Sequence, residues 1–312
     1  MESSPSDRIV PLIVATALFM ENMDSTVIST SLPAIAQALG TNPLALKLAV
    51  TSYLLSLAIC IPASGWAADR FGTRNVFRAA IGVFVLGSIG CAASHSLEEF
   101  VLARIVQGAG GAMMTPVGRL IMVRSIDKRR LVNAMALVTI PALIGPICGP
   151  PLGGFITTYA SWHWIFLINV PIGLVGIVMA SRFIPNIRVE RPDPFDYVGF
   201  LLSGCAIAGL AFGLSAMGLE FLPTSIVASL LCGGAISAVA YLIHARRSPA
   251  PILDLSLLRL PTFRASIFAG FCSASASARC RFCCRYFSRS AFISRRFNRA
   301  LSPLPPRSVR CS

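Results

Sequence analysis

The chain has 312 residues, of which 55% are hydrophobic and only 13% are charged, and its mean hydropathy is +0.72. A soluble globular domain carries about 25% charged residues, so this composition excludes that class and indicates a multi-pass membrane protein. The net charge of +14 is concentrated at one end, because residues 272–312 hold nine of the 27 basic residues and no acidic residue follows Asp254. Five of the ten cysteines also lie in this basic tail, and the others stand singly in apolar stretches. We therefore expect neither a disulfide framework nor a metal site.

A membrane-spanning helix needs about 20 apolar residues, and the sequence predicts eight such spans before residue 250. The first covers roughly residues 9–33 and contains Glu21 and Asp24, which are three positions apart on one helix face. A charge at the centre of a bilayer costs about 2.5–3.5 kcal/mol. Each carboxylate therefore either pairs structurally, lies near the headgroups, or binds and releases a proton. We favour the proton-carrying role, first for Asp24 and then for Glu21.

The second and third spans, predicted at 44–68 and 76–93, are joined by the segment GWAADRFGTRNVFR. An ordinary basic loop is one interpretation, but the spacing Gly-x-x-x-Asp-Arg-x-Gly indicates a defined turn that begins at Gly65. Gly72 would allow a tight turn because it lacks a side chain. Asp69 would cap a neighbouring helix, and Arg70 and Arg74 would pair with carboxylates or with helix C-termini.

The fourth predicted span, 100–123, contains Arg104 and Gln107 ahead of a glycine-rich stretch. Arg104 either extends its guanidinium toward the membrane interface or pairs with a carboxylate of the first span, and we favour the pairing. Gln107 is predicted to line a substrate cavity.

The fifth span is built around PALIGPICGPPLGG, residues 141–154, where Gly145, Gly149 and Gly153 form one smooth face. Such a face either packs closely against another helix or acts as a bendable seam between two moving bundles. The sixth span begins at WHWIFLINVPIG and ends near residue 184. Its Trp162 and Trp164 are predicted to anchor it at the membrane interface.

Four ordered motifs within residues 9–271 resemble the major facilitator superfamily, and within it the drug:proton antiporters with fourteen spans. The family's antiporter motif, Gly-x-x-x-Gly-Pro-x-x-Gly-Gly, is filled at every fixed position by Gly145, Gly149, Pro150, Gly153 and Gly154. The loop with Asp69 and Arg70 resembles the signature loop of the superfamily, and Thr73 replaces one of its usual basic residues.

Two further motifs, and one string, support the same resemblance. Asp24, Thr26, Leu32 and Pro33 resemble the first-helix motif, and Arg104, Gln107 and the glycines after them resemble a fourth-helix motif tied to proton transfer. The string Trp-x-Trp-Ile-Phe-x-Ile-Asn-x-Pro-x-Gly resembles a hallmark of the fourteen-span branch.

The resemblance implies efflux of amphipathic small-molecule drugs in exchange for protons, by alternating access. It places Asp24, Glu21 and Arg104 in proton coupling and the segment Gly145–Gly154 at a hinge. No cofactor is implied beyond the proton gradient, no enzyme activity is expected, and the partners would be the lipid bilayer, drugs and protons, without nucleic acid. The alternative function is a non-transporting membrane fragment, or a partner subunit that associates with an intact transporter or another transporter half.

The expected fold class is all-α and integral to the membrane. Its parts are an N-terminal six-helix bundle (1–184), a cytoplasmic linker (185–195), two extra transmembrane helices (196–245), a cytoplasmic amphipathic segment (246–264) and the start of a ninth helix (265–271). The loops on one side hold 15 Lys and Arg residues, whereas the alternate loops hold only Lys47. By the positive-inside rule, this predicts an N-terminus in the cytoplasm and a location in the cell (inner) membrane.

Residues 272–312 change abruptly from apolar to rich in Arg, Ser and Cys. A tail that binds RNA or anionic lipid and a cysteine metal site are two interpretations. The third, which we favour, is a shift of reading frame, because a neighbouring frame can encode an apolar helix here. On that interpretation the C-terminal part is incomplete, and we expect that the 312-residue chain does not transport by itself.

Overall fold

The computed structural model describes residues 5–216 and 223–270, the side chains of residues 5–8, 43, 44 and 216 excepted, and this part of the chain is helical without strands. It divides into two compact units, residues 1–253 and 254–312. The first unit contains the following helices: α1 Pro5–Ala38, α2 Pro43–Cys60, α3 Ala63–Phe71, α4 Thr73–Ala93, α5 Leu97–Ser125, α6 Lys128–Tyr159, α7 Trp164–Leu167, α8 Asn169–Phe183, α9 Tyr197–Ala216 and α10 Thr224–Arg247. The described part of the second unit contains the 3₁₀ helix η1, Leu255–Arg259, and a helical run over residues 261–270, where a ninth helix was predicted to begin.

Six helices in the described ranges are long and apolar enough to cross a membrane, and the bent pair α2–α3 makes a seventh. The remaining predicted span corresponds to α5, which has 29 residues but is less apolar. Its shortfall has a physical cause, since α5 carries Arg104 and Gln107 along with several glycines in its middle. The predicted second span is broken rather than straight, because α2 ends at Cys60 and α3 begins after Pro62 at an angle of 56°.

Local chemistry sets several helix ends. Ser96 caps α5 by accepting a hydrogen bond from the Glu99 backbone N–H, and Glu99 in turn accepts one from the His95 N–H. This reciprocal arrangement resembles a capping box. Asp127 caps α6 in the same way through the Arg129 N–H. Between α3 and α4 stands Gly72 with φ of 90°, a value that disfavours residues with a side chain.

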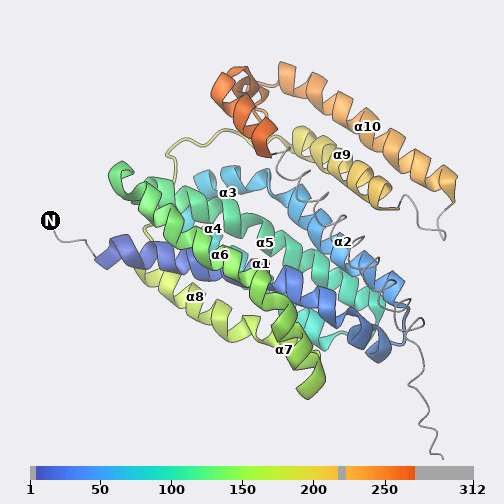
Figure 1. Ribbon diagram of the computed structural model, residues 1–312. Coiled ribbons are helices and arrows are strands. Elements are labelled where there is room, and N and C mark those ends of the chain that lie inside the picture. Colours follow the sequence, from blue (N-terminus) through green and yellow to red (C-terminus); the bar gives the residue numbers. More distant parts are fainter. Residues whose placement is uncertain (1–4, 217–222, 271–312) are drawn as a thin grey trace, which may run out of the picture. The chain divides into compact units, whose positions relative to one another are not determined.

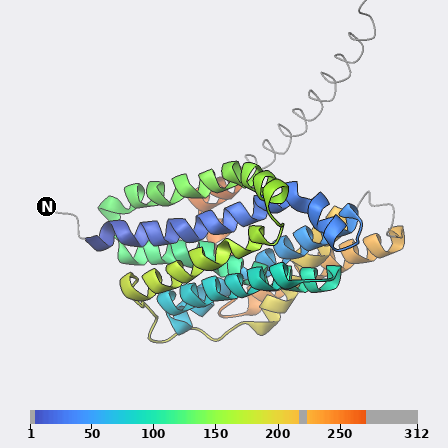
Figure 2. The same cartoon turned by 90° about the horizontal axis from the view of Figure 1, so that it is seen from below.

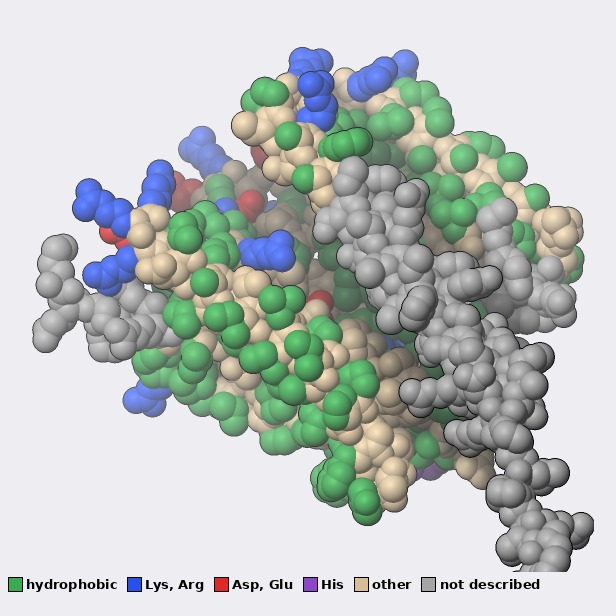
Figure 3. Space-filling view, in the orientation of Figure 1, with side chains coloured by type: hydrophobic (Ala, Val, Ile, Leu, Met, Phe, Trp, Pro, Cys, Tyr) green, Lys and Arg blue, Asp and Glu red, His purple; other side chains and the backbone are tan. Residues whose placement is uncertain are grey.

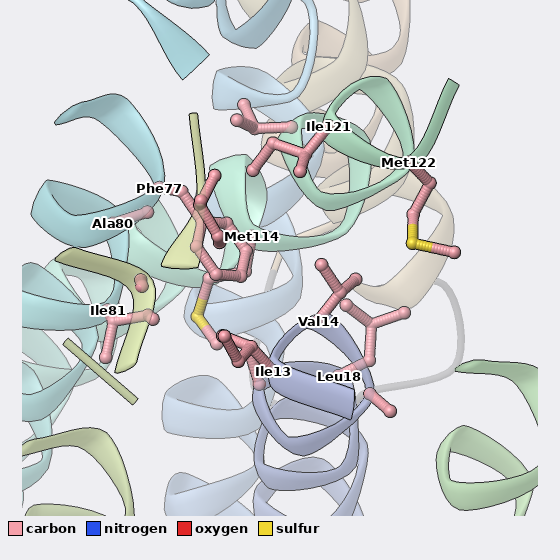
Figure 4. Close-up of a cluster of buried hydrophobic side chains, with 14 of the residues drawn as sticks. Ile13, Val14, Leu18, Phe77, Ala80, Ile81, Met114, Ile121 and Met122 are labelled. Atoms are coloured by element: carbon pink, nitrogen blue, oxygen red, sulfur yellow. The ribbon is translucent and has the colours of Figure 1, made fainter. Parts of the chain in front are cut away.

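In the first unit, α1 lies between α6 and α8, and α5 packs against both α4 and α2 (Figures 1 and 2). The apolar core between α1, α4 and α5 is shown in Figure 4, where Ile13, Val14 and Leu18 of α1 meet Phe77 and Ile81 of α4, with Met114 and Ile121 contributed by α5. Large apolar side chains on the outer faces of α6, α8 and α10 remain exposed, among them Ile147, Phe155, Val178 and Ile236. A lipid bilayer would cover such faces.

The extra helices α9 and α10 pack on each other and reach the bundle through α2. The segment before them, predicted as a linker, is bonded to the bundle rather than free. The Thr73 N–H donates to the Ile187 carbonyl, the Val189 N–H donates to the Asp69 carbonyl, and Trp66 Nε1 donates to the carbonyl of Asp193.

Candidate functional site

A buried ion pair joins α1 to α5 in the middle of the bundle. Arg104 Nη1 lies 2.6 Å from Asp24 Oδ2, and both side chains are fully inaccessible to solvent. The pairing that the sequence suggested is therefore present, and Arg104 does not extend toward an interface. Each charge alone would be very costly in this apolar interior, so each depends on the other.

Two amides complete the surroundings of the Asp24 carboxylate. Gln107 Nε2 and Asn169 Nδ2 each donate to Asp24 Oδ1 at 2.9 Å. The same two nitrogens also contact Ser88 Oγ, at 2.7 and 3.2 Å, and Arg104 Nη1 donates to Gln107 Oε1 at 2.6 Å. Side chains from α1, α4, α5 and α8 thus share one network, which we call the Asp24 network.

Aromatic rings surround the guanidinium. Arg104 Cζ lies 4.2 Å from the centre of the Tyr53 ring and 6.0 Å from that of Phe166. A cation over such a face is attracted by the ring quadrupole. Among the described residues, Arg104 Nε and Nη2, Tyr53 Oη and Asn169 Oδ1 are buried without a hydrogen-bond partner. Unpaired donors and acceptors beside an ion pair are positions where a water molecule can bind.

Glycines allow α2, α4 and α5 to approach one another closely enough for these contacts. A Cβ atom at Gly87 of α4 would lie 2.5 Å from the Gln107 backbone nitrogen, and one at Gly108 of α5 would lie 2.5 Å from the Tyr53 carbonyl oxygen. A Cβ at Gly110 would collide with the Phe84 backbone nitrogen. Gly108 and Gly110, which follow Arg104 in the sequence, therefore allow α2 and α4 to pack closely against α5.

The second carboxylate of α1 is held differently. Glu21 accepts a hydrogen bond from Thr115 Oγ1 at 2.8 Å and is partly exposed. It faces α5 as Asp24 does, about one helical turn away, but no hydrogen bond or ion pair among the described residues links it to the Asp24 network. Of the two carboxylates of α1, that of Glu21 is therefore the more accessible to solvent.

Gln107 was predicted to line a substrate cavity. In this structure it is completely buried, and both ends of its amide are occupied by Asp24, Ser88 and Arg104. A contact between Gln107 and a substrate would need a different conformation.

The turn between α3 and α4 fulfils part of the expectation. Gly72 makes the tight turn with a positive φ, whereas Asp69 was expected to cap a neighbouring helix and forms an ion pair instead. Asp69 pairs with Arg124 in the last turn of α5 at 2.7 Å, and both side chains are partly exposed. Arg70 lies over the Trp66 ring at 5.7 Å rather than against a carboxylate. Arg74 makes no ion pair among the described residues, and Gly65 of α3 is exposed with open space around it.

The glycine face of α6 packs against α1. Gly145 is in close contact with the backbone at Phe19 and Met23, and a Cβ at Gly149 or Gly153 would collide with the side chain of Thr26 or Thr30. The described residues thus show this face as a tight packing surface inside one bundle, and a hinge role for it remains a prediction. The other two motif positions do not join the contact, because Pro150 is exposed and Gly154 has open space beside it.

Sequence reasoning missed three members of the site and misplaced one residue. Ser88 and Tyr53 gave no motif signal, whereas Asn169 lay within the quoted Trp-x-Trp string and, as an amide within an apolar span, could have been suspected. Trp162 was expected at the membrane interface, but it is buried against Phe100 and Phe166, while Trp164 is 58% exposed. Among the described residues no group of His, Cys, Asp and Glu forms a metal site.

Long apolar helices around a buried charge network define a multi-pass membrane protein whose polar chemistry lies inside the bundle. The sequence model of the Major Facilitator Superfamily matches residues 14–300, and the chain belongs to this family. The family consists of transporters rather than enzymes.

Curated relatives and solved structures agree with this assignment. The chain is 44% identical over 259 residues to the "Putative multidrug resistance protein MdtD" of Salmonella heidelberg (strain SL476) and of Salmonella typhimurium (strain LT2), covering 83% of this chain and 55% of each relative. The chain therefore spans about half the length of these relatives. A proton:xylose symporter, XylE, superposes with a TM-score of 0.53 at 15% identity, over 78% of this chain and 55% of that one. A D-xylose-proton symporter gives 0.52 at 14% identity, over 77% and 68%. At such low identity the two symporters support the fold alone.

Proposed function

We propose that this chain supplies the N-terminal bundle of a multidrug efflux transporter that exchanges amphipathic small molecules for protons across the cell inner membrane. The observation that carries the proposal is the Asp24–Arg104 pair, which is fully buried and joined through a hydrogen-bond network to two further helices, α4 and α8. The name of the Salmonella relatives, a multidrug resistance protein, supports the substrate class.

The proposed coupling mechanism uses the contacts of Asp24. A proton that binds Asp24 removes the counter-charge of Arg104 and weakens the hydrogen bonds from Gln107 and Asn169. Those side chains lie on α1, α5 and α8, so protonation changes the free energy of the packing between these helices. A ligand or proton shifts a conformational equilibrium only through such a difference in free energy between states. Glu21, which is more accessible, would pass protons toward this centre.

Substrate would bind near the middle of the membrane between this bundle and a second one, as in transporters built from two repeats. The face of α6 opposite its glycines would then meet the second bundle or lipid. The N-terminus and the basic loops would lie in the cytoplasm.

The test is drug export from an efflux-deficient bacterium that expresses a fusion of residues 1–264 to the C-terminal part of the Salmonella relative. We expect the fusion to lower cellular accumulation of an amphipathic dye such as ethidium, and this effect to vanish when the proton gradient is collapsed. The 312-residue chain is measured alongside it. Dye export that persists without a proton gradient, or in the Asp24→Asn fusion, would show that the proposed coupling is wrong.

A further inference from the structure

A cavity of about 390 Å³ lies at the end of the bundle where α1 begins, separate from the Asp24 network. It is formed by the start of α4, the end of α5 and the end of α8, with Val10 of α1 at its wall. Its volume falls within the range of about 300–1,000 Å³ that is typical of ligand pockets. Its polar lining consists of Arg74, Arg182 and Ser125.

Two buried polar atoms of this cavity lack a hydrogen-bond partner in the described part of the protein and are therefore available to a ligand. Arg74 Nε and Ser125 Oγ are buried and have no hydrogen-bond partner in the described part of the chain. Among the described residues that line the cavity, none is acidic. The neighbouring Asp69 is already engaged by Arg124, so it does not neutralise either arginine of the cavity.

The rest of the wall is fixed and apolar. Val10, Ile126 and Ile184 are almost completely buried, at 3%, 6% and 1% exposure. The two arginines of the lining come from different helices, Arg74 from α4 and Arg182 from α8, and Arg182 is exposed. Figure 3 shows further basic side chains gathered at the end of the bundle from which α1 starts, where the membrane headgroups would lie.

We propose that this cavity binds a phosphate-bearing anion, in which two phosphate oxygens are held by Arg74 and Arg182 and a third accepts from Ser125. A guanidinium matches the geometry of phosphate oxygens and binds them with charge-assisted hydrogen bonds. The phosphate belongs either to an anionic lipid headgroup, for which basic pockets between helices at the cytoplasmic side are suited, or to a soluble phosphate.

A simpler role for Arg182 is to compensate the carbonyl groups at the C-terminal end of α8. The two roles differ in what they predict. Helix compensation lowers the stability of an Arg182 variant equally with and without ligand, whereas an anion site makes the effect of the ligand itself depend on Arg182.

The experiment measures the thermal unfolding midpoint of the purified 312-residue chain in neutral detergent. The probes are short-chain phosphatidylglycerol, short-chain phosphatidylcholine and inorganic phosphate, each titrated at constant ionic strength. A ligand that binds only the folded state stabilises it by RT ln(1 + L/Kd), where L is the free ligand concentration, so the midpoint rises with the logarithm of that concentration above Kd. We expect phosphatidylglycerol or inorganic phosphate to raise it and phosphatidylcholine to have a much smaller effect. The probe that acts identifies the source of the phosphate.

Arg182→Gln and Ser125→Ala are the test variants, and Arg188→Gln is the matched control. Arg188 is an exposed arginine in the following segment, outside this cavity. The apparent affinity for the active probe should fall at least tenfold in Arg182→Gln, fall less in Ser125→Ala, and stay unchanged in Arg188→Gln. Equal responses of the wild type and Arg182→Gln, or no response to either phosphate probe, would overturn the proposal.

Discussion

At the scale of single residues, the central feature is a buried charge pair. Such a pair contributes little net stability to the fold, whereas removing only one of its two charges is costly. Replacing a buried pair with apolar groups of similar volume is often neutral or stabilising, whereas removing one partner costs about 3–5 kcal/mol. Asp24 and Arg104 are both inaccessible to solvent. The stability of the bundle should therefore change strongly when one of the two charges is neutralised and the other is kept.

This asymmetry gives the first prediction. Asp24→Asn should lower the free energy of unfolding in detergent by about 3–5 kcal/mol, because Arg104 is left buried without a counter-charge. The double variant Asp24→Asn with Arg104→Met should recover at least half of that loss. Glu98→Gln, at an exposed acid of the first turn of α5, is the matched control and should change the stability by less than about 0.5 kcal/mol. A double variant no more stable than Asp24→Asn would contradict this account of the pair.

A second residue-scale prediction concerns Asn169, whose amide joins α8 to the Asp24 network. Asn169→Leu removes a donor from Asp24 and from Ser88, and should cost about 1–3 kcal/mol because buried acceptors lose a partner. In the fusion transporter the pH dependence of dye export should also shift, since Asp24 has one donor fewer. The control is Asn75→Leu, at an exposed amide in the first turn of α4. Loss of stability without any change in the pH profile would reduce Asn169 to a packing residue.

At the scale of elements, close helix contacts set the positions of these side chains. The glycines of α5 and α6 face α1, α2 and α4, and their contribution to helix packing depends on how closely the opposing helix approaches. The sequence predicts the face itself, because Gly145, Gly149 and Gly153 recur every four residues. It does not predict that the partner is α1, since spacing on one helix carries no information about its neighbour.

The glycine face can be tested with a matched pair from the same helix. A side chain at Gly149 would collide with Thr26, whereas Gly154 has open space around it. We expect Gly149→Leu to lower the free energy of unfolding by about 1–3 kcal/mol, through overpacking between α1 and α6, and Gly154→Leu to change it by less than about 0.5 kcal/mol. Similar losses from both substitutions, read from denaturant unfolding, would mean that the α1 contact does not decide the outcome, since Leu is a better helix former than Gly and helix propensity cannot cause a loss.

The start of α9 is joined to the end of α10 by the carboxylate of Asp196, which has several partners. Asp196 Oδ1 accepts from the Gly199 N–H and contacts His244 Nε2, both at 2.8 Å, and Oδ2 accepts from the Ile252 N–H. Burial alone would raise the pKa of Asp196, but these hydrogen bonds outweigh it and hold the pKa below its ordinary value. Because the folded pKa is the lower one, the stabilisation is present above the unfolded pKa of about 3.9. It is lost as the pH falls through the folded pKa.

A pH titration of stability checks this junction. The difference in unfolding midpoint between the wild type and Asp196→Asn should be constant from neutral pH down to about pH 5, and should shrink as the pH falls below the unfolded pKa of about 3.9 and through the lower folded pKa. Asp193→Asn, at an exposed acid of the same segment, supplies the control and should show no such convergence. A difference that is the same at both ends of the range would mean that the charge of Asp196 does not stabilise the junction.

At the scale of the whole molecule, what the sequence could and could not predict follows from how each signal arises. The cost of a charge in lipid marks Asp24 and Arg104, and two such charges in one apolar chain suggest a pair. The heights of Ser88, Tyr53 and Asn169 relative to that pair depend on how four helices are aligned, which local patterns do not encode. The break near Pro62 and the low hydropathy of α5 differ in this respect, because the proline, Arg104, Gln107 and the glycines that cause them are visible in the sequence.

The orientation of the chain is the last prediction, and it depends on charge rather than on packing. The Gly72 turn, the start of α6 and the segment after α8 are rich in Lys and Arg and the N-terminal start of α1 carries Arg8, whereas the alternate connections near Asn42 and His95 carry only Lys47. Basic loops resist transfer across the inner membrane. We therefore expect alkaline phosphatase, which is active only outside the cytoplasm, to be active when fused after Asn42 or His95 and inactive when fused after Asp193. Green fluorescent protein at the same positions should give the opposite pattern. Removing the basic group Lys128, Arg129 and Arg130 should reduce this contrast, because that loop then loses most of its charge. An active phosphatase after Asp193 in the unmodified chain would reverse the orientation and place the cavity of Arg74 and Arg182 outside the cell.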